Sequence, residues 1–195
     1  MKAKIIFATK NKNKMKEIRE ILADKDYEIL SMEEAGISID VVEDGTTFEE
    51  NALIKSRAIR DYVKDAIVLS DDSGLEIDYL GGAPGIYSAR FEGVDTPYSV
   101  KNQIILNKLE GVPDEERTAR FVCAVAAAFP DGTDQVVRGT IEGMIGYESA
   151  GENGFGYDPI FFVPEYRCTT AEMSAEQKNE ISHRGKALRM IAKYL

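Results

Sequence analysis

The chain has 195 residues, enough for one sizeable core, so we expect a single domain over residues 1–195. Hydrophobic residues make up 44% and charged residues 30%, which argues against disorder, and no apolar run approaches the ~20 residues of a membrane helix. The net charge of −10 argues against a nucleic-acid partner, because phosphate contacts need a basic surface. The N-terminus lacks the features of a signal peptide, so we expect a cytoplasmic protein without a membrane partner.

The charge is unevenly distributed along the chain. Residues 1–20 carry seven Lys or Arg against two Glu, whereas residues 33–50 carry seven acids and no base. A small anion that is bound together with a divalent metal suits this division better than a long polyanion does.

The first part of the chain predicts alternating strands and helices. Short apolar runs rich in β-branched residues indicate buried strands, and apolar residues at helical spacing indicate helices. Thr47 and Glu50 have the spacing of a helix capping box. We expect strand, helix, strand, helix and strand at residues 4–9, 13–23, 27–32, 46–63 and 66–70. This order is typical of an α/β fold.

Turn residues divide the second part of the chain into shorter elements. Residues 74–91 predict a strand, a glycine-rich turn and another strand, and residues 119–145 predict an antiparallel hairpin around PDGTD. A helix is expected between them, at residues 97–109. A short strand follows the glycine-containing GFGYDP, and two helices begin at Ser174 and Ser182. We therefore expect a mixed β-sheet with flanking helices.

Several common catalytic motifs are missing from the sequence. It contains no GxxxxGK[ST] phosphate loop, no GxGxxG, no HExxH and no GxSxG. A single histidine, His183, excludes a multi-histidine metal site, and Cys123 and Cys168 have the spacing of neither a zinc site nor a disulfide framework. The remaining chemistry is that of carboxylates, lysines and the neighbours His183 and Arg184.

Three polar residues fall on the predicted turn from the first strand to the first helix, namely Thr9, Asn11 and Lys14. Helix N-terminal amides and an ammonium group bind anions at such a turn. Glu17 follows Lys14 by one helical turn, where it can orient the ammonium. The alternative interpretation is a solvated, lysine-rich turn.

The acidic stretch offers oxygen ligands for a cation at Glu43, Asp44, Glu49, Glu50 and Asn51. Mg²⁺ prefers a few carboxylates together with phosphate and water oxygens, so one residue here and one from the pair Asp71 and Asp72 would suffice. The alternative is an exposed acidic loop before a helix whose first turn is rich in Glu.

Asp71 and Asp72 are expected to close the strand at residues 66–70. Adjacent residues on an extended chain point to opposite sides, so one can face a cleft while the other supports the turn. An Asx turn with Ser73 and Gly74 is the alternative, and we expect Asp71 to do little more than end the strand.

Two more polar stretches lie near the end of the chain. His183 and Arg184 begin the last predicted helix, with Lys178 on the helix before it, and together they suit an electron-rich ligand. Phe155 lies between two glycines, where its ring can stack on a base. A surface His and Arg without function, and an aromatic anchor, are the simpler alternatives.

Taken together, these stretches resemble the inosine triphosphate pyrophosphatase family, also described as Ham1-like. The match runs in the family's order from FATKNKNKMKEI through VVEDGTTFEENALIKS, LSDDSGLEIDYLGGAPGIYSARF and GFGYDPIFF to EQKNEISHRGKAL. The resemblance implies an elongated mixed sheet whose helices form two lobes around a central cleft, and usually a homodimer. It also implies Mg²⁺-dependent hydrolysis of ITP, dITP or XTP to the nucleoside monophosphate and pyrophosphate.

The family's functional residues match this sequence position by position. Asp72 is similar to the family's general base and, with Glu43, to its metal ligands. The resemblance implies substrate-binding roles for Thr9, Lys10, Asn11, Lys12, Asn13, Lys14, Ser73, Phe155, Gly156, Tyr157, Asp158, Lys178, His183 and Arg184. The sequence departs from the family at Lys10, where many relatives have glycine.

Two other functions are compatible with the same stretches. One is a pyrophosphatase for other modified nucleotides, as in the Maf-like group, which the SHRGKAL ending disfavours. The other is a non-catalytic purine nucleotide sensor, which would not need Lys14, Glu43 and Asp72 together.

Overall fold

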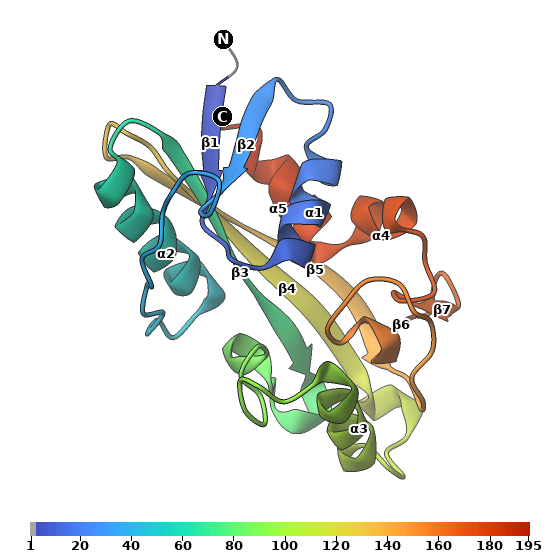
Figure 1. Cartoon of the computed structure of the whole chain (residues 1–195). Helices are drawn as coiled ribbons and strands as arrows, with labels where there is room; N and C mark the ends of the chain where they lie inside the picture. The colour runs from blue at the N-terminus through green and yellow to red at the C-terminus, as the bar shows by residue number, and fades with distance from the viewer. Residues whose placement is uncertain (1–2) are drawn as a thin grey trace. The chain divides into compact units, whose positions relative to one another are not determined.

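The computed structural model describes residues 3–195, which form a mixed α/β structure (Figure 1). Its seven strands follow the order β2-β1-β3-β4-β5-β6-β7 in the sheet. Their bounds are β1 Ala3–Phe7, β2 Tyr27–Ser31, β3 Ile67–Ile77, β4 Thr118–Ala128, β5 Asp134–Ile145, β6 Phe161–Val163 and β7 Cys168–Thr169. The α-helices are α1 Lys12–Ile21, α2 Phe48–Val63, α3 Tyr98–Lys108, α4 Ala175–Ile181 and α5 His183–Ile191. β1 is parallel to β2 and β3, whereas β6 is antiparallel to β5 and β7, which confirms the predicted mixed sheet.

The described chain divides into two compact units, each made from segments that are separate in the sequence. The first unit comprises the chain up to Asp72, Cys123–Gly139 and His183–Leu195, and the second comprises Ser73–Val122 and Thr140–Ser182. Strands β3, β4 and β5 contribute residues to both units. The single domain expected from the sequence stays a prediction. None of the helices in residues 3–195 is both long and apolar enough to cross a lipid bilayer.

In the first unit, β1 is buried on both faces. Ile5 and Phe7 belong to a core that includes residues of α1 and α5, whereas Ile6 belongs to another core with Ile59 of α2. Side chains alternate along a strand, so each layer of helices receives every second residue. Figure 1 shows α1 and α5 side by side, in contact with each other. This two-sided burial explains why residues 5–7 of β1 form a continuous apolar run.

α1 begins one residue before the predicted position 13 because local hydrogen bonds close its first turn. The side-chain oxygen of Asn11 accepts hydrogen bonds from the amides of Asn13 at 2.9 Å and Lys14 at 3.2 Å. Thr9 supports the turn by accepting a hydrogen bond from the amide of Asn11 at 3.1 Å. These contacts satisfy amides that have no partner within the helix.

The predicted capping box of α2 is only half formed. Thr47 accepts a hydrogen bond from the amide of Glu50 at 3.1 Å, as expected. The Glu50 carboxylate accepts its own hydrogen bonds from the amide and hydroxyl of Thr46, at 2.7 and 2.8 Å. The short hydrogen bonds of the Glu50 carboxylate therefore come from Thr46, which offers two donors.

β3 continues through Asp71 and Asp72 to Ile77, so the expectation that these aspartates end a strand is wrong. Leu75 and Ile77 are 0% exposed and belong to the core of the second unit. Apolar residues in alternate positions therefore keep the chain extended beyond the polar stretch.

The second strand expected within residues 74–91 is also absent from the described chain. Two short 3₁₀ turns, Asp78–Leu80 and Gly85–Tyr87, take its place. The hydroxyl of Ser88 accepts a hydrogen bond from the amide of Leu75 at 2.9 Å and donates one to the carbonyl of Gly85 at 2.6 Å. A side chain thus binds the edge of β3 where a second strand was expected.

The hairpin expected at residues 119–145 is confirmed, with β4 and β5 on either side of the PDGTD turn. The amide of Phe129 donates a hydrogen bond to the carbonyl of Thr133 at 2.9 Å. Asp131 stabilises the turn by accepting hydrogen bonds from the amide and hydroxyl of Thr133, at 2.9 and 2.7 Å.

A buried guanidinium supports the second unit. Arg117 is 1% exposed, and it donates to the carbonyls of Ile145 at 2.8 Å, Leu109 at 2.7 Å and Gly146 at 2.6 Å. One side chain therefore satisfies carbonyls at the end of β5 and at the end of α3.

We expect Arg117→Met to lower the free energy of unfolding by at least about 3 kcal/mol, because the carbonyls of Ile145, Leu109 and Gly146 lose their donor. Urea denaturation followed by circular dichroism measures this change. Arg120→Met is the matched control. Arg120 binds Asp78 with its side chain 28% exposed, so its loss should change the stability by less than about 1 kcal/mol. Equal effects of the two substitutions would contradict the role given to Arg117.

Candidate active site

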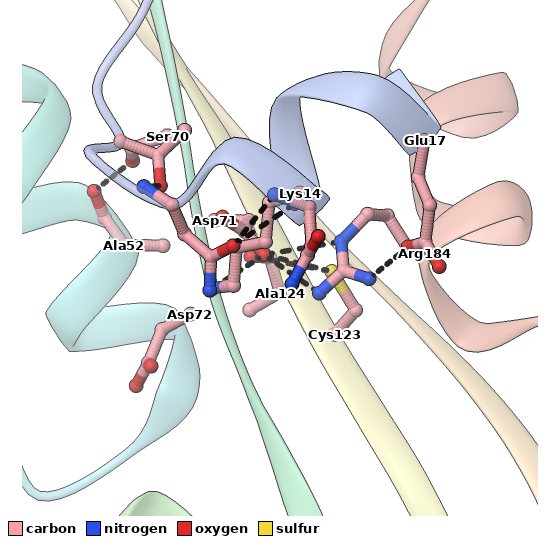
Figure 2. Close-up of polar contacts among 12 residues, drawn as sticks. Lys14, Glu17, Ala52, Ser70, Asp71, Asp72, Cys123, Ala124 and Arg184 are labelled. Carbon is pink, nitrogen blue, oxygen red and sulfur yellow. Dashed lines mark hydrogen bonds and ion pairs between the residues drawn. The ribbon is translucent and has the colours of Figure 1, made fainter. Parts of the chain in front are cut away.

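Asp71 is the centre of a buried charge cluster in the first unit (Figure 2). Its side chain is 0% exposed, and its Oδ2 atom accepts hydrogen bonds from the ammonium of Lys14 at 2.9 Å and from Nη2 of Arg184 at 3.3 Å. Nη1 of Arg184 donates to the carboxylate of Glu17 at 2.5 Å. The cluster joins the start of α1, the middle of β3 and the start of α5. Two cations face two carboxylates, which offsets the cost of burying each charge.

The charges of this cluster stabilise one another. Burial alone would raise the pKa of Asp71, but Lys14 and Arg184 hold it well below its usual range. Burial would lower the pKa of Arg184, and Asp71 raises it instead. Burial and the nearby Asp71 raise the pKa of the Cys123 thiol to about 12, so the thiol stays protonated and is a poor nucleophile. The expectation that Asp71 does little more than end a strand is therefore wrong.

Asp72 has a different environment from its neighbour. Figure 2 shows its side chain directed away from the cluster around Asp71, as alternation along β3 requires. Its Oδ2 atom accepts a hydrogen bond from Nδ2 of Asn51 at 3.0 Å. Burial raises the pKa of Asp72 to about 6, and the nearby Glu43 acts in the same direction, against Asn51 and two lysines. A carboxylate with this pKa is ionised at neutral pH and suits a proton acceptor.

Glu43 is held in the same unit by residues of α2. Its Oε2 atom accepts a hydrogen bond from the ammonium of Lys55 at 2.8 Å. Asn51 is 2% exposed, and its Oδ1 accepts from the amide of Gly45 at 2.9 Å while its Nδ2 binds Asp72. A Cβ atom on Gly45 would lie 2.8 Å from Oδ1 of Asn51, so this approach requires glycine. Asn51 thus ties the segment that carries Glu43 to β3.

The two carboxylates fit a divalent cation. Both are partly exposed, and Glu43 raises the pKa of Asp72, a repulsion that a cation would relieve. Within residues 3–195 no group of three or more His, Cys, Asp or Glu is arranged to hold a metal ion. Phosphate and water oxygens would therefore have to complete the coordination, which is the usual arrangement for Mg²⁺.

The predicted phosphate turn has one partly buried cation among exposed residues. The side chain of Lys14 is 17% exposed, whereas that of Lys10 is 59% exposed. The other exposed positions of the turn are Asn11, Lys12 and Asn13. Lys10 forms an ion pair with Asp40. This lysine therefore links the turn to the acidic segment before Glu43.

In the second unit, Asp158 organises the glycine loop, by which we mean residues 154–158. Its Oδ2 atom accepts hydrogen bonds from the amide of Phe155 at 2.8 Å and from the ammonium of Lys178 at 2.6 Å, and its Oδ1 accepts from Thr170 at 2.8 Å. The ammonium of Lys178 also lies 5.0 Å from the centroid of the Phe155 ring. A Cβ atom on Gly154 would lie 2.1 Å from Oδ2 of Asp158, so the tight loop needs glycine there. The structure thus brings together three of the residues predicted to bind a base.

The remaining predicted residues lie in both units. Tyr157 is 4% exposed, and its hydroxyl donates to the carbonyl of Ser88 at 2.7 Å, which anchors the glycine loop. Ser73 is a partly exposed residue of β3 in the second unit. His183 is the first residue of α5 in the first unit and is 6% exposed. The predicted site residues therefore form two groups. The first unit contains the predicted metal-binding carboxylates and most of the cations, and the second unit contains the glycine loop.

Comparison with known proteins indicates the same family as the sequence motifs do. The family model described as Ham1 family matches residues 5–194. A dITP/XTP pyrophosphatase of Clostridium perfringens is 52% identical over 190 residues, which cover 95% of this chain and 93% of the relative. The chain belongs to the Ham1 family. Another dITP/XTP pyrophosphatase, from Bacillus subtilis, is 46% identical over 97% of this chain and 96% of its own length.

Solved structures of Ham1 proteins share the fold. The Staphylococcus aureus Ham1 protein has a TM-score of 0.87 and 41% identity, and the match covers 98% of this chain and 97% of that one. A structure from Mycobacterium abscessus, described as a nucleoside-triphosphatase and dITP/XTP pyrophosphatase, has a TM-score of 0.76 and 38% identity over 96% and 98% of the two chains. These matches confirm the family and the mixed α/β fold predicted from the sequence.

Sequence reasoning overlooked two residues that hold the carboxylates of this Ham1 chain. The acidic stretch predicts Asn51 only as an oxygen ligand, whereas its Nδ2 donates to Asp72, and Lys55, which binds Glu43, belongs to no predicted site. The two lie four residues apart in α2 and so share one helix face. That spacing, directly after an acidic segment, was the signal available in the sequence.

We expect neutralisation of the two adjacent aspartates to change stability in opposite ways. Asp71→Asn leaves Lys14 and Arg184 without their shared carboxylate, so the free energy of unfolding should fall by about 3–5 kcal/mol. The folded-state pKa of Asp72 lies above its ordinary value, so ionisation of Asp72 destabilises the fold as pH rises through about 6. Asp72→Asn should therefore keep or raise the stability at pH 8.

Urea denaturation at pH 8 and pH 5, in EDTA, measures both effects. Any gain from Asp72→Asn should shrink at pH 5, where the wild-type carboxyl is protonated. If both substitutions lowered the free energy of unfolding similarly at pH 8, the environments of Asp71 and Asp72 would be equivalent, and the difference inferred between them would be wrong.

Proposed function

We propose that this chain hydrolyses the deaminated purine nucleoside triphosphates XTP, dITP and ITP to the nucleoside monophosphate and pyrophosphate, with Mg²⁺ as cofactor. The observation that carries the proposal is the environment of Asp72, a mostly buried carboxylate with a raised pKa beside Glu43 and two lysines. Relatives about half identical in sequence are named dITP/XTP pyrophosphatases, which supports the substrate class.

Glu43 and Asp72 are the residues that would hold the cation. Mg²⁺ bound there would offset the negative charge of the phosphates and polarise phosphorus. Lys55 and Asn51 keep the two carboxylates in place, at 2.8 Å from Glu43 and 3.0 Å from Asp72.

Asp72 is the proposed general base. Its carboxylate accepts a proton from a water molecule whose oxygen forms a bond to the α-phosphorus. The bond between the α-phosphorus and the bridging oxygen breaks, and pyrophosphate leaves with the bonding electrons. Lys14, whose ammonium Asp71 holds at 2.9 Å, stabilises the charge that develops on the phosphates.

The glycine loop and Lys178 are the proposed binding site for the base. XTP, dITP and ITP present a 6-oxo acceptor where ATP presents a donor, and a mispaired buried donor costs about 1–3 kcal/mol. Lys178, His183, Arg184 or a backbone amide supplies the complementary donor in this proposal. Since Arg184 also donates to Asp71 and Glu17, we assign it in addition the task of holding the cluster behind Lys14.

We further infer that the protein acts as a homodimer in the cytoplasm. The support for both statements is the family resemblance, through the motifs that extend over nearly the whole chain.

The proposed activity predicts rapid pyrophosphate release from XTP, dITP and ITP, and at least tenfold lower kcat/KM with ATP, a difference of about 1.4 kcal/mol. Incubation with each triphosphate and with a modified pyrimidine triphosphate, followed by chromatography of the products, tests this. EDTA should abolish turnover and added Mg²⁺ should restore it. Release of phosphate in place of pyrophosphate, or tight binding without turnover, would overturn the proposal.

Asp72→Asn should reduce kcat for XTP by at least about 100-fold at saturating Mg²⁺, because the amide cannot accept the proton. Asp65→Asn, at an exposed position after α2, is the matched control and should retain wild-type kcat. Near-normal turnover of Asp72→Asn would exclude Asp72 as the base.

A further inference from the structure

One hydrogen bond to the glycine loop comes from a helix to which neither the motifs nor the comparisons give a role. Nδ2 of Asn102, in α3, donates to the carbonyl of Gly156 at 3.1 Å. Asn102 is 3% exposed, and its Oδ1 has no hydrogen-bond partner within residues 3–195. A buried acceptor without a partner destabilises a fold, so asparagine is not the side chain that packing alone would favour.

Asn102 and Asp158 hold the two ends of one short segment. Asp158 accepts a hydrogen bond from the amide of Phe155 at 2.8 Å, and Asn102 donates to the carbonyl of the next residue. Gly154 and Gly156 flank Phe155 with φ values of +71° and +69°, in the region where glycine is least restricted. Phe155 thus lies between two permissive backbone positions, and one side-chain hydrogen bond is made on each side of it, at its own amide and at the Gly156 carbonyl.

Other contacts hold the surrounding face of α3 in place. Tyr98 lies one turn before Asn102, and a Cβ atom on Gly156 would be 3.7 Å from its ring. The Tyr98 ring packs edge-on against Tyr157, with 5.1 Å between centroids. The ammonium of Lys101 donates to the carbonyl of Ala89 at 2.7 Å. Asn102 therefore contacts the loop from a helix that is itself held in place.

We propose that Asn102 is a positioning residue for the purine base. By holding the Gly156 carbonyl it keeps the Phe155 ring in one orientation, so the ring is ordered before the base stacks on it. Binding to a preordered ring avoids the cost of ordering it in the complex. This inference rests on the proposed function, in which the glycine loop binds the base, and it leaves the chemistry at Asp72 unchanged.

Asn102→Leu tests the proposal, because leucine has nearly the same shape and no hydrogen-bonding group. We expect the KM for XTP to rise about 3- to 10-fold, as for loss of one hydrogen bond, with kcat within about twofold of wild type. Inhibition by inorganic triphosphate, which has no base, should be unchanged. The urea midpoint should change little, because removal of the unpartnered Oδ1 offsets loss of the donor to the Gly156 carbonyl. Asn107→Leu, at an exposed position of the same helix, is the matched control and should leave every quantity unchanged.

An unchanged KM for XTP would overturn the inference. So would an equal loss of affinity for XTP and inorganic triphosphate, or a fall in stability that accompanies the KM change, because either would indicate general loosening of the unit. If Asn102→Leu does not fold, Asn102→Ser replaces it, since serine is too short to reach Gly156. Failure of the proposed function is distinct, because the wild-type protein would then release no pyrophosphate from XTP, dITP or ITP.

Discussion

Burial of the Asp71 carboxylate requires two cations from distant parts of the sequence to lie beside it. Lys14 and Arg184 meet this requirement at 2.9 and 3.3 Å, and Glu17 binds the other side of Arg184. Removing one partner of a buried ion pair is strongly destabilising, so the start of α1, the middle of β3 and the start of α5 stabilise one another. The ion pair between Lys14 and Asp71 also holds the end of the turn that we propose as the phosphate site. The stability of the first unit and its proposed phosphate site therefore depend on the same contact.

Alternation along β3 gives two neighbouring aspartates opposite properties. Asp71 faces cations, which keep its pKa well below the usual range, whereas burial raises the pKa of Asp72 to about 6. One residue type therefore supplies a permanently charged structural anchor and, one position later, a candidate base. The strand itself makes this separation possible, because adjacent side chains on an extended chain cannot share an environment.

The second unit uses the same principle around Asp158. This carboxylate is 2% exposed and binds Lys178, Thr170 and the amide of Phe155. It shapes a loop whose glycines allow a tight backbone path, while Asn102 holds the other end of the segment. In each unit a buried carboxylate with a lysine partner thus positions the residues that we assign to substrate binding.

The sequence by itself determined the family, the mixed α/β class and most of the helices and strands, because apolar periodicity and capping residues act over a few positions. It also marked the residues in the glycine loop and at the start of α5. Only the tertiary structure decided that β3 continues past Asp72, that Ser88 binds the strand edge in place of a second strand, and that Asp71 is buried. Asn51, Lys55 and Asn102 likewise gained their roles from partners in other elements. A local pattern shows which side chains are polar, but burial and partners depend on segments that meet only when the chain folds.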